Sequence, residues 1–519
     1  MLDCIVIGAG PGGLVTTKEL LENGIHNILC LEQGDAIGGV YRHTYDSLTL
    51  TSSCTFSMYS DFWIGDGRQH HFWTKAEVLQ YWTDYAQHYG VMNVLRFGTQ
   101  VESAELLDDH WRLHLKDGEV LECRRLALAT GGNRHINLPA WHTQLHAVEA
   151  CHSRDYRNAQ RFEGKTVLVV GGGESGADIA LEVSRSARQC WVSLRRSAGW
   201  ILPRHRGNMA ADIATHRGLY GLPRSFGSRL SRLISAHEAS TNDPVNRAAA
   251  ELNSRVDSPF GVWGIYGTKN FSLPEAVARH GCKVVGAVSE IRDGGREIDF
   301  ADGTRLRGID AVVFCTGYTS RVEFLPEPLQ NRDPRSLFKH LLDPELGTRL
   351  AWIGMARPCF GSQFPIMEMQ ARYFALLCKR TLQLPALQEM HATIQRDREQ
   401  FIGQLGHHAE RIRSLVDYHH YMDDTAMVFF LSASANLAAS GLWRNPGHAV
   451  SLAGARAEAP VGPRHPRETP GCPLQPCGQG RFAGPSAACH RTPVRNDHSD
   501  PATFALNRRV STGQCSAMG

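Results

Sequence analysis

Two glycine triplets recur in this chain at one spacing, and that spacing is typical of a turn that binds a diphosphate. Each triplet follows an apolar, β-branched run, at 5–7 and at 167–170. The triplets are Gly8, Gly10 and Gly13, and Gly171, Gly173 and Gly176. In such a turn the first glycine allows the bend, the second lets a pyrophosphate approach, and the third lets the helix pack on the strand. Both copies predict a strand, a turn and a helix whose N-terminus faces the phosphates.

The two copies differ at the position about 20 residues beyond the turn, where the adenosine ribose is recognised. The first copy has Glu32 there, and the second has Arg195 followed by Arg196. A carboxylate accepts hydrogen bonds from ribose hydroxyls, whereas guanidinium groups bind a 2′-phosphate. We therefore expect an unphosphorylated dinucleotide at the first site and NADPH at the second. An arginine pair in a solvated loop is the alternative interpretation.

The rest of the sequence predicts the helices and strands that surround these turns. A helix is expected over 75–90, a β-meander over 101–129 with a turn at Asp117-Gly118, and a largely helical stretch over 208–258. The strand ending in ATGG, 129–132, resembles the later strand that ends in CTGY, 315–318. If both strands belong to one sheet, the chain leaves its first domain near residue 140 and returns near residue 312.

The predicted fold class is α/β, with two nested Rossmann-like dinucleotide-binding domains of the three-layer ββα type and a disordered C-terminal tail. The expected parts are 1–145 and 312–445 for the first domain with its C-terminal helices, 146–311 for the inserted domain, and 446–519 for the tail. The tail is rich in Pro, Gly and Arg and lacks Lys and Ile, a composition that buries too little apolar surface to fold. A genuine tail and an error in the gene model both fit this composition.

Composition narrows the classes of function. With 519 residues, 42% hydrophobic content and a net charge of +3, the chain suits several globular domains and lacks the charge of a nucleic-acid or membrane-surface protein. The N-terminus leads directly into the first strand, so we expect a cytoplasmic protein. The stretch 426–443 contains serines and an asparagine, which favours a docking helix over a transmembrane segment. Cys472, Cys477, Cys489 and His490 match no common zinc spacing, so no metal is expected.

Taken together, these motifs resemble the class B flavin-dependent monooxygenases, and most closely the flavin-containing branch that oxygenates nitrogen or sulfur. The resemblance covers about residues 1–425. His152, Tyr156 and Arg157 match the second half of the family fingerprint, but His146 and Val148 stand where it has Phe and Gly. EMQAR, 368–372, matches a segment near the flavin in relatives, and SLRRSAGW, 193–200, matches the loop that binds the 2′-phosphate.

The resemblance implies two cofactor sites. Residues expected to bind FAD are Gly8, Gly10, Pro11, Gly12, Gly13, Glu32, Gln33, Gly39, Val40, Tyr41, Val101, Thr130, Gly131 and Gln370. Residues expected to bind NADPH are Gly171, Gly173, Glu174, Ser175, Gly176, Arg195, Arg196, Thr316 and Gly317. Thr51 or Ser52 takes the place of an asparagine that many relatives carry beside the flavin ring, and these two are the candidate catalytic residues.

The implied reaction is a monooxygenation. NADPH reduces FAD, O₂ forms a C4a-hydroperoxide on the flavin, and one oxygen passes to the N or S atom of a small molecule, in a setting such as secondary metabolism. The implied partners are O₂ and that substrate, with an oligomer allowed. Baeyer–Villiger oxidation of a ketone and a non-catalytic redox module stay open as alternatives. A disulfide reductase is excluded because the chain has no C-x-x-C pair. The substrate pocket is expected within 200–270.

Overall fold

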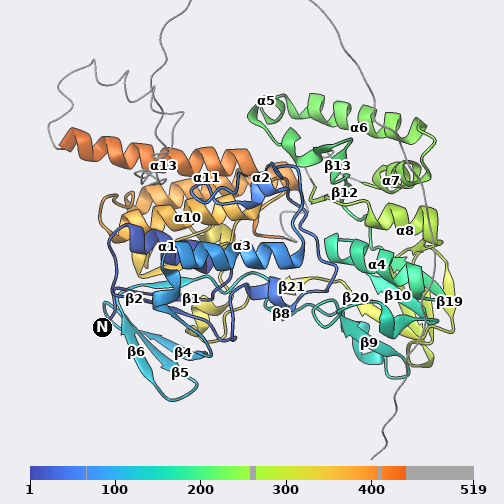
Figure 1. Cartoon of the computed structure of the whole chain (residues 1–519), viewed down its shortest axis with the longest axis horizontal. Coiled ribbons are helices and arrows are strands. Elements are labelled where there is room, and N and C mark those ends of the chain that lie inside the picture. Colours follow the sequence, from blue (N-terminus) through green and yellow to red (C-terminus); the bar gives the residue numbers. More distant parts are fainter. Residues whose placement is uncertain (66, 257–264, 407–411, 440–519) are drawn as a thin grey trace, which may run out of the picture. The chain divides into compact units, whose positions relative to one another are not determined.

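Two parallel β-sheets organise the computed structural model, which describes residues 1–65, 67–256, 265–406 and 412–439 (Figure 1). In the first sheet all neighbouring strands are parallel. Its order is β22 (Leu350–Trp352), β7 (Leu126–Leu128), β1 (Cys4–Ile7), β2 (Ile28–Leu31) and β3 (Leu95–Arg96). The strands are short apolar runs because both faces of the sheet are covered.

Alternate side chains of β1 enter two different cores. Cys4 and Val6 pack in the core that contains residues of the helices, and Ile5 and Ile7 pack against the antiparallel meander. The helices are α1 (Pro11–Glu22), α3 (Lys75–His88) and α10 (Gln363–Cys378), and the meander consists of β4 (Val101–Leu106), β5 (Trp111–Leu115) and β6 (Val120–Cys123). Figure 1 shows the sheet between these two layers. The helix expected over 75–90 and the meander expected over 101–129 are present.

The second sheet repeats this plan. Its order is β16 (Lys283–Val285), β11 (Gln189–Ser193), β10 (Thr166–Val170), β20 (Ala311–Phe314) and β9 (Glu149–His152), all parallel. One face packs on α4 (Glu174–Ser186) and α8 (Ser272–His280). The other packs on the antiparallel strands β17 (Val288–Arg292), β18 (Glu297–Phe300) and β19 (Arg305–Arg307). The α/β class with three layers is therefore confirmed, twice over.

One expected boundary is wrong. The strand 311–314 pairs with β10 and β9 in the second sheet, so the inserted part does not end at residue 311. The return to the first sheet is made by β22, which pairs with β7. The ATGG and CTGY strands resemble each other because they occupy equivalent places in two similar sheets. Between the sheets, β8 (His135–Ile136) pairs antiparallel with β21 (Tyr318–Thr319).

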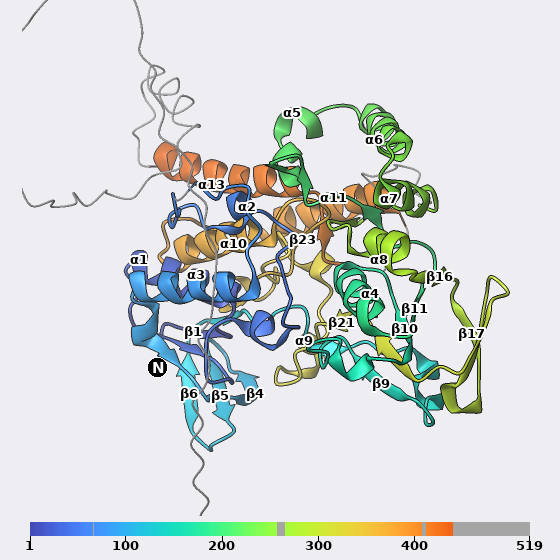
Figure 2. The same cartoon turned by 45° about the vertical axis from the view of Figure 1, so that its right-hand side comes forward.

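The stretch that was expected to be helical lies farther from the second sheet than α4 and α8 do, as Figures 1 and 2 both show. It contains β14 (Met209–Ala210), the 3₁₀ helix η5 (Ala211–Ala214), α5 (Arg217–Tyr220), α6 (Arg224–Ser240) and α7 (Pro244–Ser254), and β13 (His205–Arg206) lies just before it. Shorter pairs are β12 (Trp200–Ile201) with β15 (Gly267–Thr268) and β23 (Arg357–Pro358) with β24 (Leu415–Val416). The other α-helices of the described residues are α2 (Cys54–Ser57), α9 (Glu327–Gln330), α11 (Leu387–Leu405) and α13 (Tyr418–Ala439).

The structure describes only part of the C-terminal region for which the sequence makes predictions. The segment proposed as a docking helix falls on α13 as far as Ala439. Among the described residues, none of the helices combines the length and the apolar character that crossing a membrane requires. The predicted tail, which includes Cys472, Cys477, Cys489 and His490, lies outside the described residues.

Candidate functional site

The first glycine turn joins β1 to α1 and is closed by backbone on its inner side. A Cβ on Gly13 would lie 1.8 Å from the carbonyl oxygen of Gly8, and one on Gly8 would lie 2.6 Å from that of Ala129. Gly8 also has φ +105°, which residues with a side chain rarely adopt. Gly10 caps α1 without a side-chain hydrogen bond, so the first N–H groups of the helix are left for an anion.

Glu32 stands at the end of β2, beside this turn. Its Oε2 accepts the N–H of Ala9 at 2.8 Å, and its Oε1 accepts the N–H of Gly34 at 2.8 Å. At the neighbouring end of β7, Thr130 Oγ1 is buried with no hydrogen-bond partner among the described residues, and Gly131, at φ +76°, has open space where a side chain would stand. An unsatisfied hydroxyl beside a bare backbone concavity fits the phosphates and ribose of FAD.

The other residues expected to bind FAD surround this turn. Gly39, Val40 and Tyr41 lie in the 3₁₀ helix η1 (Gly39–His43), and a Cβ on Gly39 would lie 3.2 Å from the Cα of Gly10. Val101 is buried at the start of β4, and Gln33 is exposed. Their individual contacts with FAD stay predictions.

Gln370 has structural contacts of its own, and its expected contact with FAD stays a prediction. Its side chain is fully buried. Its Oε1 accepts the N–H of Gly354 at 2.8 Å, and its Nε2 donates to the hydroxyl of Tyr421 at 2.9 Å. We therefore assign Gln370 to holding the loop after β22, where Ile353 packs beside Gly12.

The second glycine turn, between β10 and α4, has the same closed inner side. A Cβ on Gly176 would lie 2.1 Å from the carbonyl oxygen of Gly171, and one on Gly171 would lie 2.5 Å from that of Cys315. Gly173, which caps α4, has nothing within 4 Å of the place where a Cβ would stand. This open face fits a second pyrophosphate.

Among the residues expected to bind NADPH, some side chains are exposed and others already form hydrogen bonds within the protein. Arg195 and Arg196 are exposed immediately after β11. The carboxylate of Glu174 is instead used within the protein, because it accepts the N–H of Lys269 and the amide of Asn270, both at 2.8 Å. Thr316 donates its hydroxyl to the carbonyl of Asn137. Glu174 and Thr316 therefore have structural contacts of their own.

The fingerprint residues are also structural. The Tyr156 hydroxyl donates to Glu182 at 2.6 Å, and Arg157 donates to the carbonyl of Arg154 at 2.8 Å. The ring of His152, buried, meets that of Tyr318 edge to face at 4.9 Å. These contacts join the loop after β9 to α4 and the end of β9 to β21, which agrees with a role in domain geometry.

Thr51 and Ser52 lie next to an amine that the sequence patterns did not reveal. Lys269 donates its Nζ to the carbonyl of Gly361 at 2.7 Å, and this Nζ lies 3.4 Å from Ser52 Oγ. Burial lowers the pKa of Lys269, and the nearby carboxylates of Glu174 and Asp212 oppose that effect. The chain thus places a cation-forming group beside the two candidate catalytic hydroxyls.

A cavity of about 150 Å³ opens beside these residues and draws its walls from three separate parts of the chain. We call it the interdomain cavity. Thr51 and Phe72 come from the N-terminal part of the chain, and Phe360 lies just after β23. The other lining residues lie within 200–269. A cavity is thus present within the stretch 200–270, where the substrate pocket is expected, and Thr51 borders it. Arg204, Asp212 and Lys269, which also line it, belong to no motif and could not have been singled out from the sequence.

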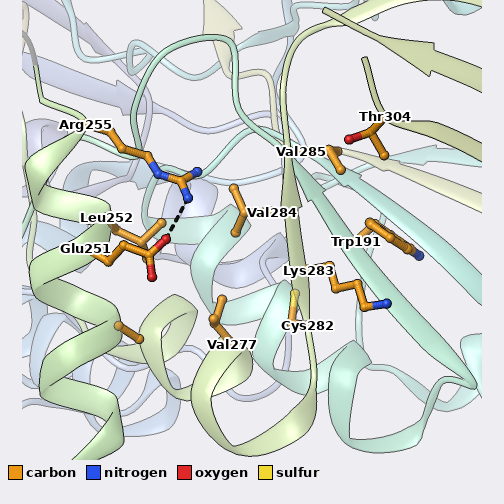
Figure 3. A pocket seen from close by; sticks show the side chains of 11 residues that line it. Trp191, Glu251, Leu252, Arg255, Val277, Cys282, Lys283, Val284, Val285 and Thr304 are labelled. Atoms are coloured by element: carbon orange, nitrogen blue, oxygen red, sulfur yellow. Dashed lines mark hydrogen bonds and ion pairs between the residues drawn. The ribbon is translucent and has the colours of Figure 1, made fainter. Parts of the chain in front are cut away.

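A second, more open cavity of about 360 Å³ lies beside the edge strand β16 (Figure 3). Figure 3 shows the ion pair of Glu251 with Arg255 on one side and Trp191 with Lys283 on the other. All of its lining residues fall between 191 and 304, and the interdomain cavity shares none of them. This cavity therefore lacks any contribution from the first glycine-turn domain.

Comparison with known proteins agrees with this geometry. The profile of the flavin-binding monooxygenase-like family matches residues 3–453. A 4-hydroxybenzoate brominase (decarboxylating) of Pseudoalteromonas luteoviolacea is 32% identical over 438 residues, with 81% of this chain and 82% of the relative covered. Flavin-containing monooxygenase 5 of Oryctolagus cuniculus is 31% identical, with 76% of each chain covered.

The fold is also similar to that of OTEMO, solved in complex with FAD and NADP, with a TM-score of 0.59, 18% identity and coverage of 78% of this chain and 90% of the other. The family match spans most of the chain and includes both glycine turns, one beside Glu32 and one beside Arg195. The protein therefore belongs to the flavin-binding monooxygenase-like family, as an NADPH-dependent oxidoreductase whose cofactors are FAD and NADPH.

Proposed function

We propose that this enzyme transfers one oxygen atom from O₂ to the nitrogen or sulfur atom of a small, largely apolar substrate held in the interdomain cavity. The observation that carries the proposal is the position of that cavity. It is bordered by Thr51 of the first glycine-turn domain and by Lys269, whose N–H is bound by Glu174 at the start of α4. A substrate in this place lies between the elements that bind the two cofactors.

The chemistry that bound FAD supplies is acceptance of a hydride from NADPH and activation of O₂. The chain would contribute binding, orientation and exclusion of water. The glycine turns hold the pyrophosphates, Glu32 recognises one ribose, and Arg195 with Arg196 recognises the 2′-phosphate. Apolar walls at Trp200, Ile201 and Phe360 keep water from the reacting atoms.

A second candidate function is halogenation of a phenolic acid, which the brominase relative favours. The interdomain cavity contains three basic residues, Arg204, Arg206 and Lys269, which suit an anionic substrate or a halide ion. Arg206 is paired with Glu238 at 3.0 Å, and Arg204 lies 3.7 Å from Asp178 Oδ2. Lys269, which donates to the carbonyl of Gly361, is therefore the cation that this reaction would use first.

The FAD-loaded enzyme should be assayed in air for NADPH oxidation and H₂O₂ release. The test compounds are N,N-dimethylaniline, methyl phenyl sulfide, cyclohexanone, and 4-hydroxybenzoate with bromide. Products that gain one oxygen atom from the amine or the sulfide support the first proposal. A lactone from cyclohexanone would support Baeyer–Villiger oxidation, and a brominated phenol would support the second candidate. NADPH oxidation that yields only H₂O₂ with all four compounds would contradict both proposals.

Two substitutions on α6 test the place of the substrate. Ser231 lines the interdomain cavity and Ser228, one turn earlier on the helix, does not. We expect Ser231→Phe to raise KM for the oxygenated substrate about tenfold or more by filling the space, without loss of FAD. Ser228→Phe should leave KM near the wild-type value. Equal effects of the two substitutions would argue against this cavity as the substrate site.

A further inference from the structure

Two cysteines of the second sheet lie opposite each other on neighbouring strands. Cys190 is the second residue of β11, and Cys282 immediately precedes the edge strand β16. These strands pair in parallel with Trp191 opposite Lys283, and Lys283 Nζ lies 4.9 Å from the centre of the Trp191 ring. Cys190 and Cys282 are the residues one step earlier on the two strands, so the same register places them side by side.

The next residues back along both strands are also in contact. The side-chain amide of Gln189 donates to the carbonyl of Gly281 at 3.2 Å. The two cysteines are therefore flanked by contacts between the strands on both sides. Neighbouring strands lie about 4.8 Å apart, and a disulfide requires a separation of about 4.4–6.8 Å between the two Cα atoms. The backbone thus suits a disulfide at this position.

The two thiols also point into the same core. Side chains alternate between the faces of a sheet, and Cys190 and Cys282 both belong to the cluster that packs on α4 and α8. Cys190 Sγ donates to the carbonyl of Ala180 at 3.7 Å, and a hydrogen-bond contact joins the Cys190 and Cys282 thiols. Both residues are free cysteines. Side-chain direction and strand register therefore agree.

One of the two thiols borders a cavity. Cys282 lines the more open cavity of about 360 Å³ beside β16, as Figure 3 shows, and Cys190 does not line it. Both residues are otherwise buried. A small neutral oxidant that enters this cavity meets Cys282 first, and Cys190 is the thiol next to it.

A second pair of cysteines in this sheet fails the same geometric test. Cys151 of β9 is opposite Val313 of β20, and Cys315 lies two residues farther along the chain than Val313. Two residues of a strand span about 6.6 Å, so the Cα atoms of Cys151 and Cys315 are about 8 Å apart. That separation is too long for a disulfide without movement of the backbone.

We propose that Cys190 and Cys282 are a peroxide-sensitive thiol pair, which hydrogen peroxide converts into a disulfide between β11 and β16. Cys282 attacks the peroxide: an S–O bond forms, the O–O bond breaks, and a sulfenic acid and water result. The Cys190 sulfur then attacks the Cys282 sulfur, an S–S bond forms, and the hydroxyl group leaves as a second water. Two electrons pass from the sulfur atoms to the peroxide, and both thiol protons end in water.

The position of the pair connects this oxidation to the enzyme. Hydrogen peroxide is the by-product of a flavin monooxygenase whose activated oxygen meets water instead of substrate. β11 ends just before Arg195 and Arg196, and the N–H of Leu194 donates to the carbonyl of Val285 in β16 at 2.9 Å. A disulfide would therefore join the two strands that support the arginines expected to bind the 2′-phosphate.

The test treats the oxidised, FAD-loaded enzyme with hydrogen peroxide in the absence of NADPH and then alkylates free thiols under denaturing conditions. Trypsin releases Cys190 in the peptide 189–195 and Cys282 in the peptide 280–283. We expect these peptides to be joined, and to separate after dithiothreitol. Recovery of both peptides alkylated, after a peroxide dose that oxidises the exposed Met209, would overturn the proposal, as would linkage of either peptide to another cysteine. Because no turnover is needed, this result is independent of the oxygenation assay.

Variants assign the roles of the two thiols. In Cys190→Ser the second step is blocked, so peroxide should leave a sulfenic acid on Cys282 that dimedone traps. In Cys282→Ser, Cys190 should stay reduced because it does not line the cavity. Cys151→Ser is the matched control and should form the linked peptides as the wild type does. A dimedone adduct on Cys190 in Cys282→Ser, or loss of the linkage in folded Cys151→Ser protein, would overturn the proposal. If a variant fails to fold, the wild-type peptides still decide the question.

Discussion

The carboxylate of Glu32 accepts the backbone N–H of Ala9, inside the first glycine turn, at 2.8 Å. Its other oxygen accepts the N–H of Gly34 at the same distance. One side chain thus joins the end of β2 to the turn between β1 and α1. At the equivalent place after β11, Arg195 and Arg196 are exposed. The two dinucleotide turns are therefore built alike but carry groups of opposite charge at the places where the riboses are expected to bind.

Replacing Glu32 by glutamine should weaken FAD binding. The amide keeps one acceptor but turns an N–H₂ group towards the second backbone N–H, and the ribose loses a charged acceptor. We expect a loss in FAD affinity of about tenfold or more, measured by flavin fluorescence titration of the apoprotein. Asp35→Asn removes a carboxylate whose side chain is 89% exposed and should bind FAD as the wild type does. Equal FAD affinity in all three proteins would contradict the role of Glu32.

Replacing Arg195 and Arg196 together by alanine should change the preference between nicotinamide cofactors. The kcat/KM for NADPH is expected to fall about 10- to 100-fold, because charge-assisted hydrogen bonds to the 2′-phosphate are lost. The value for NADH, which lacks that phosphate, should change little. Arg307→Ala removes an exposed arginine of β19 in the same part of the chain and serves as the control. A parallel loss for both cofactors would indicate a structural effect instead.

Much of the fold could be predicted because the glycine turns impose local geometry that is independent of the rest of the chain. Gly13 and Gly176 are required by contacts within a few residues, so the pattern alone placed β1, α1, β10 and α4. The error at the strand 311–314 has a different origin. Two similar sheets end in similar Thr-Gly pairs, and only the pairing of β20 with β10 shows to which sheet the second pair belongs.

The cofactor sites were more predictable than the substrate site for the same reason. Glu32 and Arg195 occupy fixed distances from their turns, whereas Asp212 meets Ser53 and Lys269 meets Gly361 across large sequence separations. Gln370 was expected at the flavin because of the motif around it, yet its contacts with Gly354 and Tyr421 depend on helix packing. Tertiary contacts of this kind leave no periodic or motif signal.

Two glycines of the second turn should respond differently to alanine. In Gly176→Ala the Cβ would lie 2.1 Å from the carbonyl oxygen of Gly171, so we expect a lower thermal midpoint or failure to fold. Gly173 has φ −72° and nothing within 4 Å, so Gly173→Ala should fold with an unchanged midpoint. Its methyl group should still crowd the pyrophosphate and raise KM for NADPH several-fold. Midpoints that fall equally in both variants would contradict this account of the turn.

His340 should make the stability of the protein depend on pH in the acid range. Its ring is 2% exposed and packs edge to face on Phe401 and Tyr421. Burial, reinforced by the positive charges of Arg335 and Lys339, lowers the pKa of His340 to about 3. Between the ordinary pKa near 6.5 and about 3, the unfolded chain binds a proton at this ring that the folded chain does not. Lower pH therefore favours unfolding.

The expected contribution of this one ring is a loss of about 1.4 kcal/mol in the free energy of unfolding for each pH unit below about 6. His340→Asn removes the titrating ring and tolerates the positive φ of 52° at this position. The variant should be less stable at pH 7, because a buried ring is lost, yet its thermal midpoint should fall less steeply than that of the wild type between pH 6.5 and 5. His391→Asn, at a histidine that is 55% exposed, should follow the wild-type slope. If His340→Asn also keeps that slope, the ring is protonated in the folded protein, and other groups would have to account for acid unfolding.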